Sequence, residues 1–125
     1  MSSPTEIRLK IKLRNDTPKD VLILIKKCLS RENLSNTPNK RFFKTERWFN
    51  MFSTMAYDGY EQPYLNEVKN GYELKIHTDI NYMNKELDTF IEWIKPFVFG
   101  RKKKVFLGDK LPDYDYERTN IYLYR

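Results

Sequence analysis

Hydrophobic and basic residues alternate strictly near the start of the chain. Every second position is aliphatic and the positions between are basic, so that Ile7, Leu9, Ile11 and Leu13 alternate with Arg8, Lys10, Lys12 and Arg14. Because successive side chains of a strand point to opposite faces of its sheet, this pattern predicts a half-buried strand with a cationic outer row. Such a strand is typical of a sheet covered on one face only, whose other face is left to solvent or to a partner.

Two later segments have the spacing of amphipathic helices. In the first, Thr17 is the expected N-cap and Pro18 the first helical residue. Its apolar positions form one wide stripe, consisting of Val21, Leu22, Leu24, Ile25, Cys28 and Leu29. In the second, Asn84 is the expected cap, and Pro96 and Gly100 end the helix. Its predicted core stripe consists of Leu87, Phe90, Ile91 and Ile94.

The segment 64–78 has the pattern of a β-hairpin. Two strands flank Asn70-Gly71, a dipeptide that tolerates the positive φ angles of a type I′ turn. In the second strand, alternation places Glu73, Lys75 and His77 on the same face.

Two short strands are expected near the C-terminus, over residues 105–107 and 119–124. In the second, alternation turns two aliphatic residues inward and Tyr122 and Tyr124 outward. The acidic segment 109–117 between these strands is expected to be a surface loop.

The fold class follows from the order of these elements. Residues 41–60 are rich in aromatic side chains without a clean period; a strand over 47–57 is favoured, with a short helix opening at Thr45 as the alternative. We therefore predict one α+β domain over residues 1–125, in two layers: an antiparallel or mixed sheet of five to six strands with two helices on one face. This arrangement is broadly ferredoxin-like.

Composition narrows the compartment and the class of partner. The net charge of +6 favours acidic partners, and an aromatic content of 15% favours contact with other macromolecules. A single cysteine excludes an intramolecular disulfide framework and is compatible with a reducing compartment. The longest apolar run, Val21–Ile25, is far shorter than the roughly 20 residues that cross a bilayer. We expect a cytoplasmic protein that does not enter a membrane.

The residue types that carry catalysis and metal binding are sparse. His77 is the only histidine, which excludes a site with several histidine ligands, and Cys28 lies on a core stripe, where a thiol is inert. Asp113, Asp115 and Glu117 alternate with tyrosines and could offer oxygen ligands to a hard cation, but a solvated acidic loop is the favoured interpretation. Phosphate-binding glycine loops and C-x-x-C pairs are missing from the sequence. We expect neither an enzyme nor a bound cofactor or metal.

The basic face of the sheet is the strongest candidate site. The side chains expected to share it and to bind a partner are Arg8, Lys10, Lys12, Arg14, Lys75, His77, Tyr122 and Tyr124. A secondary basic patch consists of Arg101, Lys102, Lys103 and Lys104. Cations beside aromatic rings suit single-stranded nucleic acid, although Glu73 on the same face opposes it. Alternatively, the charges only keep an open sheet soluble.

Four segments carry a resemblance to known proteins, over about half of the chain. They are Leu13-Arg14-Asn15-Asp16-Thr17-Pro18 with the helix after it, Arg47-Trp48, the segment LDTFIEWIKPF at 87–97, and Phe106-Leu107-Gly108 with the acidic loop and strand that follow. With these the chain resembles a loose group of small uncharacterised α+β proteins of low-GC Gram-positive bacteria and their phages. The basic run at 101–104 departs from the more acidic pattern of that group.

The resemblance implies a role in bacterial conflict, as an immunity protein or a phage counter-defence inhibitor. Together with the missing catalytic motifs and the many aromatic residues, it predicts a non-catalytic protein that acts by occupying a protein partner with an acidic surface. The alternative is a nucleic-acid-binding protein that uses the basic, tyrosine-bearing face of its sheet, and a small enzyme is a third hypothesis.

Overall fold

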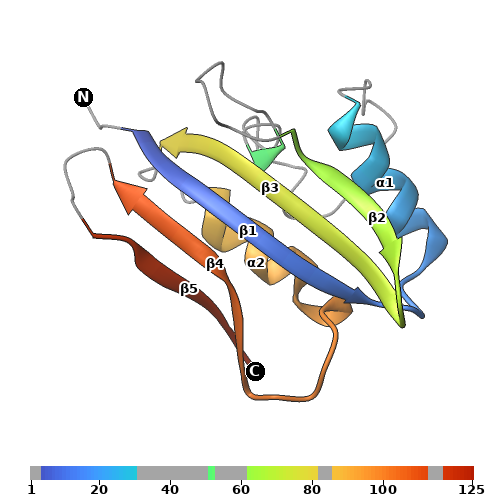
Figure 1. Cartoon of the computed structure of the whole chain (residues 1–125). Coiled ribbons are helices and arrows are strands. Elements are labelled where there is room, and N and C mark those ends of the chain that lie inside the picture. Colours follow the sequence, from blue (N-terminus) through green and yellow to red (C-terminus); the bar gives the residue numbers. More distant parts are fainter. Residues whose placement is uncertain (1–3, 31–50, 53–61, 82–85, 113–116) are drawn as a thin grey trace.

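The alternating N-terminal segment forms the central strand of a five-stranded antiparallel sheet (Figure 1). The computed structural model describes residues 4–30, 51–52, 62–81, 86–112 and 117–125. In chain order the elements are β1 (Pro4–Arg14), α1 (Lys19–Leu29), β2 (Tyr64–Val68), β3 (Gly71–Asn81), α2 (Glu86–Ile94), the 3-10 turn η4 (Lys95–Phe97), β4 (Lys104–Pro112) and β5 (Thr119–Tyr124).

The strand order confirms the predicted α+β fold in two layers. The strands lie in the order β2-β3-β1-β4-β5, and every neighbouring pair is antiparallel. From β1 to β4 the chain therefore follows the β-α-β-β-α-β path of a ferredoxin-like fold, with β1 and β3 at the centre. β5 is added beside β4 at one edge of the sheet. Both helices lie behind the sheet in Figure 1, so they cover the same face.

The aliphatic row of β1 lies in the core, as its alternation predicts. Ile7, Leu9, Ile11 and Leu13 are each at most 2% exposed. They pack in one cluster with the inward residues of β3 and with the apolar stripes of the helices. The predicted stripe of α1 is buried except for Leu29, which packs at the margin of the cluster. In α2, Leu87, Phe90 and Ile94 are buried, and Ile91 is partly exposed at the margin.

The hairpin between β2 and β3 forms one residue earlier than predicted. Val68 pairs with Gly71, so the turn residues are Lys69 and Asn70. Asn70 has a φ of 66°, whereas Gly71 does not have a positive φ. The turn is therefore not the type I′ turn that was expected over Asn70-Gly71, because that type needs positive φ at both central residues. Gly71 has another role: a Cβ atom there would lie 2.1 Å from the carbonyl oxygen of Leu13.

The start of α1 also differs from the prediction. Pro18 occupies the N-cap position, and no side chain caps the helix there. Instead, the Thr17 hydroxyl donates a hydrogen bond to the carbonyl of Arg14 at 2.6 Å. A threonine side chain can close a turn in this way and is then not available as a helix cap. The predicted role of Thr17 as the N-cap is therefore wrong, and its side chain belongs to the turn after β1.

Some predictions concern residues outside the described ranges. The strand expected over 47–57 is described only at Met51 and Phe52, which are buried and lie in a short 3-10 turn and the turn after it, so the strand prediction is wrong at these two residues. The cap at Asn84 and the carboxylates of Asp113 and Asp115 lie outside the described residues. The acidic loop begins later than expected, because β4 continues to Pro112.

Candidate functional site: the open face of the sheet

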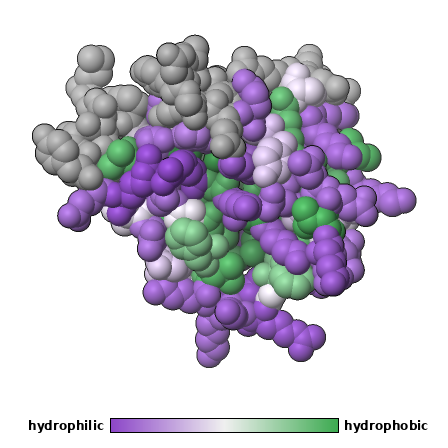
Figure 2. Space-filling view, viewed as in Figure 1, coloured by the Kyte–Doolittle hydropathy of each residue, from purple (hydrophilic) through white to green (hydrophobic). Residues whose placement is uncertain are grey.

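The face of the sheet turned away from the helices, here called the open face, gathers most of the predicted site residues. Register places Arg8 opposite His77 and Lys10 opposite Lys75 on the central strands. On β5, Tyr122 and Tyr124 alternate with the buried Ile121 and Leu123 and therefore lie on the open face as well. Figure 2 looks onto this face and shows an apolar area near its middle, surrounded by hydrophilic side chains.

The basic row of β1 is interleaved with carboxylates. The Arg8 guanidinium forms two hydrogen bonds of 2.9 Å with Asp109. Arg14 pairs with Asp16 at 2.6 Å, and the Lys10 ammonium lies 3.7 Å from a Glu73 oxygen. The open face is therefore mixed in charge and is not the continuous cationic strip that the alternation of β1 indicates. Lys12 contacts an aromatic ring, with its ammonium 4.1 Å from the centre of the Phe99 ring.

A chain of ion pairs fixes one end of the open face. Glu6 binds Nε2 of His77 at 2.6 Å through one oxygen and Arg118 at 2.7 Å through the other. Arg118 also donates to Asp109 at 2.9 Å, and Asp109 holds Arg8. These five residues, here called the ion-pair chain, come from β1, β3, β4 and the residue before β5. The ion-pair chain thus adds side-chain contacts between these four segments to the backbone pairing of the sheet.

The carboxylates of the ion-pair chain are stabilised in their charged form. Burial raises the pKa of Glu6, but hydrogen bonds from His77 and Arg118 outweigh it, so that this pKa lies below its ordinary value of 4.5. The pKa of Asp109 is likewise lowered from 3.8, because the hydrogen bonds of Arg8 and Arg118 outweigh desolvation. Charge-assisted hydrogen bonds of this kind hold side chains in fixed positions. We conclude that this end of the open face is preorganised.

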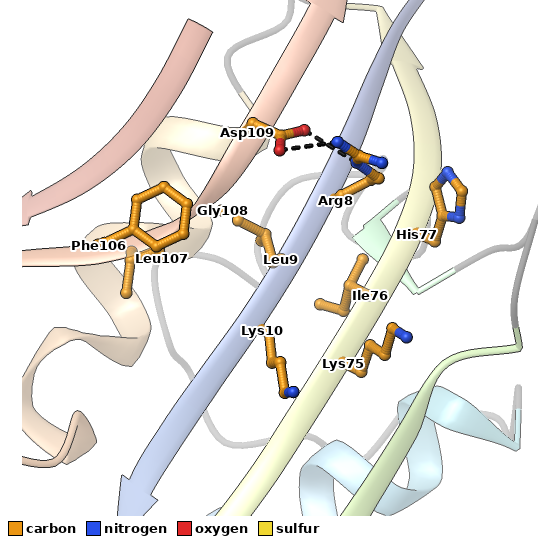
Figure 3. A pocket seen from close by; sticks show the side chains of 10 residues that line it. All are labelled: Arg8, Leu9, Lys10, Lys75, Ile76, His77, Phe106, Leu107, Gly108 and Asp109. Atoms are coloured by element: carbon orange, nitrogen blue, oxygen red, sulfur yellow. Dashed lines mark hydrogen bonds and ion pairs between the residues drawn. The ribbon is translucent and has the colours of Figure 1, made fainter. Parts of the chain in front are cut away.

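A hollow of about 330 Å³ lies beside the ion-pair chain (Figure 3). The residues that line it are Arg8, Leu9, Lys10, Lys75, Ile76, His77, Phe106, Leu107, Gly108 and Asp109. Leu9, Ile76 and Leu107 also border it, although they are almost fully buried and belong to the core cluster. In Figure 3 the pair of Arg8 with Asp109 lies at the top of the hollow, and Lys10 and Lys75 lie at the bottom. The Phe106 ring lies at the left.

A β-bulge in β4 shapes this hollow. The pairing of β4 with β5 skips a residue between Phe106 and Gly108. Such an extra residue shifts the alternation of a strand, so that Phe106 and Asp109, three positions apart, both face the open side. Gly108 is required at the bulge because a Cβ atom there would lie 1.9 Å from the carbonyl oxygen of Arg8.

Three aromatic rings continue from the hollow along β4 and β5. Phe106 and Tyr122 are in edge contact with centroids 5.8 Å apart, and Tyr122 lies 6.2 Å from Tyr124. Phe106 is 55% exposed and Tyr124 is 62% exposed. The Lys104 ammonium lies 4.2 Å from the centre of the Tyr122 ring. These three rings, here called the aromatic ridge, present apolar area at the surface, which is typical of interaction sites.

The secondary basic patch is only partly connected with the open face. Arg101, Lys102, Lys103 and Lys104 are all exposed, and Lys104 reaches the aromatic ridge. The first three precede β4, where Arg125 bonds to the carbonyl oxygens of Lys102 and Lys103. A second hollow of about 430 Å³ lies at the end of β1, lined by Arg14, Asn15, Asp16, Phe99, Gly100 and Arg101.

Sequence reasoning missed several residues of this surface. Glu6 has the same alternation parity as Arg8, and Phe106 alternates with inward-facing neighbours in its strand, so the pattern could have placed both on the open face. Asp109 could not be placed, since the bulge shifts the alternation before it. Arg118 joins the site through contacts with residues far away in the sequence, which leave no local signal.

Comparisons of the chain with protein-family models, with curated proteins and with solved structures found no match. Among the described residues, no three histidine, cysteine, aspartate or glutamate side chains are grouped so that they could hold a metal ion. Within the same ranges, no helix has the length and hydrophobicity that a membrane crossing requires.

Proposed function

We propose that this protein is a non-catalytic binding protein that acts by occupying a protein partner through the open face of its sheet. The observation that carries the proposal is the combination of the hollow, the aromatic ridge and the lysines that border them on a face the helices leave uncovered. Protein interfaces are enriched in exposed aromatic residues and arginine, surrounded by a polar rim. The lysines suit a partner whose surface is acidic.

The chemistry of the hollow supports binding more than catalysis. None of the described residues that line it carries a hydroxyl or thiol side chain, and the Nε2 atom of His77 is held by Glu6. The thiol of Cys28 is buried in the core, where desolvation raises its pKa to about 12 and suppresses the reactive thiolate. The ion pairs beside the hollow therefore hold side chains in place, and we assign no reaction to the residues that form them.

The setting that we propose is host–phage or toxin–immunity conflict in the cytoplasm. The resemblance of the sequence to immunity and counter-defence proteins supports this setting, and the small size of the chain suits an inhibitor that works by covering a surface of its target. An inhibitor of this type needs a rigid, preorganised face, which the ion-pair chain supplies.

Binding of single-stranded nucleic acid is the second candidate function. The observation in its favour is the aromatic ridge with Lys104 beside it, since rings can stack on bases while ammonium groups contact phosphates. The carboxylates of Glu73 and Asp109 on the same face oppose it, because they repel a phosphate backbone. This balance favours a protein partner.

Capture of partners from a lysate of the cells that encode the protein tests both candidates. The bait is wild type, the face variant Lys10→Glu/Lys75→Glu, or the control Lys19→Glu/Lys27→Glu, which makes the same charge change on exposed positions of α1. We expect a protein that survives nuclease treatment to bind wild type and the control, and to be lost with the face variant. Equal capture by all three baits would refute the proposal.

Titration with single-stranded DNA and RNA oligonucleotides separates the second candidate. Binding that depends on Lys10 and Lys75 and persists at physiological salt would favour nucleic acid. We expect binding at low salt that disappears at physiological salt, as for any surface with a modest excess of cations.

A further inference from the structure

We propose that the hollow on the open face is an anchor site for an acidic segment of a protein partner. An aromatic or large aliphatic side chain of that segment enters the hollow against Phe106, and an adjoining carboxylate lies between Lys10 and Lys75. This inference rests on the proposed function and names the chemistry by which the partner is recognised.

The apolar part of the hollow fits one large side chain. Its volume of about 330 Å³ lies at the lower end of the range of roughly 300–1,000 Å³ that is usual for binding pockets. Phe106, which is 55% exposed, is the apolar side chain that the hollow presents, because Leu9, Ile76 and Leu107 are at most 2% exposed. A partner ring in the hollow would take the exposed part of Phe106 out of water, and rings packed at an angle gain more than their buried area alone provides. Interface hot spots are anchors of this kind.

Two lysines supply the charge for an anion at the border of the hollow. Lys10 and Lys75 are directly opposite each other on neighbouring strands, and both line the hollow. Residues in this relation have Cβ atoms about 5 Å apart, so that one carboxylate of a partner can contact both ammonium groups. Lys10 is accessible to it, since its side chain is 68% exposed and its contact with Glu73 is long, at 3.7 Å.

The carboxylates near the hollow already accept hydrogen bonds within the protein. Asp109 is bound by Arg8 and Arg118, and the Tyr64 hydroxyl donates to Glu73 at 2.6 Å. Their charge is thus balanced locally, while the ammonium of Lys10 remains directed to solvent. The rim of the hollow is also held in place before a partner arrives, which lowers the entropy cost of binding.

The distribution of charge favours a peptide segment over a nucleic acid. A nucleic acid strand repeats its phosphates at a regular short spacing, so a strand lying across the hollow would bring phosphates near Glu73 and Asp109 as well as near the lysines. A peptide can place one carboxylate at Lys10 and Lys75 and apolar or neutral side chains elsewhere. The combination of one apolar hollow with one local cationic pair is what such a segment needs.

Selection from a phage-displayed library of random dodecapeptides tests this inference without knowledge of the partner. The library is selected on wild type after depletion on Phe106→Ala, and the enriched peptides are then synthesised and titrated by fluorescence anisotropy. We expect enriched sequences in which an aromatic, leucine or methionine residue adjoins aspartate or glutamate. Their affinity should fall about tenfold or more with Phe106→Ala and with Lys10→Glu/Lys75→Glu.

The matched control is Phe99→Ala, which removes a phenylalanine of similar exposure, 43%, at the far end of β1. It should leave the affinity of the peptides unchanged. The inference is overturned if no peptide is enriched, if the enriched peptides lack acidic residues, or if Phe99→Ala weakens them as much as Phe106→Ala does.

An oligonucleotide that displaces the peptides at physiological salt with a higher affinity than theirs would also overturn the inference. Failure of this inference can be distinguished from failure of the proposed function. If the lysate partner is lost with Lys10→Glu/Lys75→Glu but retained with Phe106→Ala, the open face binds a protein and the hollow is not its anchor.

Discussion

Removing a phenyl ring from the helix layer and from the open face of the sheet should have very different effects on stability. Phe90 in α2 is 0% exposed and packs against Phe52 at 5.7 Å and Trp93 at 6.2 Å between ring centroids. Phe106 on the open face is 55% exposed and, among the described residues, has one ring contact, with Tyr122. Phe90→Ala and Phe106→Ala are therefore chemically identical deletions in opposite environments.

The expected magnitudes follow from these exposures. A buried phenylalanine replaced by alanine costs about 3–5 kcal/mol, because a cavity remains in addition to the lost burial. Full burial of such a side chain contributes about 1.5–3 kcal/mol. At Phe106 roughly half of that applies, no cavity forms, and the edge contact with Tyr122 adds a fraction of a kcal/mol. We expect a loss of about 1–2 kcal/mol for Phe106→Ala and at least about twice that for Phe90→Ala.

Urea unfolding followed by circular dichroism measures both losses, provided that the slope with denaturant is the same for the two variants and wild type. A domain of this size has a total stability of about 5–15 kcal/mol, so the Phe90 variant should unfold at a clearly lower urea concentration. A loss at Phe106 equal to that at Phe90 would mean that the open face is covered by another part of the chain. It would also remove Phe106→Ala as a reporter of binding.

Three further outcomes are expected. The pKa values of Glu6 and Asp109 are lowered in the folded protein, so their contribution to stability is complete above the ordinary values of 4.5 and 3.8 and is lost as pH falls through the folded values. The free energy of unfolding should therefore decrease below about pH 4.5, and it should decrease less steeply in Glu6→Gln. Cys28 should react slowly with a thiol reagent in the native state and rapidly in urea, because burial raises its pKa to about 12; rapid native labelling would contradict its place in the core. Gly71→Ala should cost about 1–3 kcal/mol or more in urea unfolding, because its Cβ atom would meet the Leu13 carbonyl at 2.1 Å; an unchanged midpoint would place β1 and β3 in another register.

The elements that depend on local alternation could be predicted from the sequence. The row of Ile7 to Leu13 is enough to place β1 in a half-covered sheet, and the same parity correctly turns Tyr122 and Tyr124 outward. The apolar stripes of α1 and α2 follow from helical spacing, and the structure confirms them except at their margins. In each of these strands and helices one face is buried, so the spacing of apolar residues in a short stretch of sequence is enough to predict the element and its buried face.

The features that the sequence did not reveal depend on contacts with distant residues. The turn residue Asn70 was found, but its glycine neighbour is required by the approach of β1, which no local rule indicates. The bulge of β4 reverses the alternation and hides Asp109 from pattern analysis. The basic row was predicted as a continuous cationic strip because a carboxylate such as Asp109, which binds Arg8, meets it only after the sheet is assembled.

The position of β1 in the sheet has a consequence for the order in which the chain folds. β1 is synthesised before the other described strands, yet its neighbours begin only at Gly71 and Lys104. The hairpins of β2 with β3 and of β4 with β5 can form from nearby residues, whereas β1 must close two long loops to enter between them. Until then, an aliphatic row and both of its hydrogen-bonding edges are exposed to other nascent chains.

The basic row of β1 is expected to protect the chain during that interval. Arg8, Lys10, Lys12 and Arg14 give every copy of the unpaired strand the same dense positive charge, which opposes strand pairing between copies. Arg8 and Lys10, which border the hollow in the folded protein, are thus expected to oppose aggregation before the sheet is assembled.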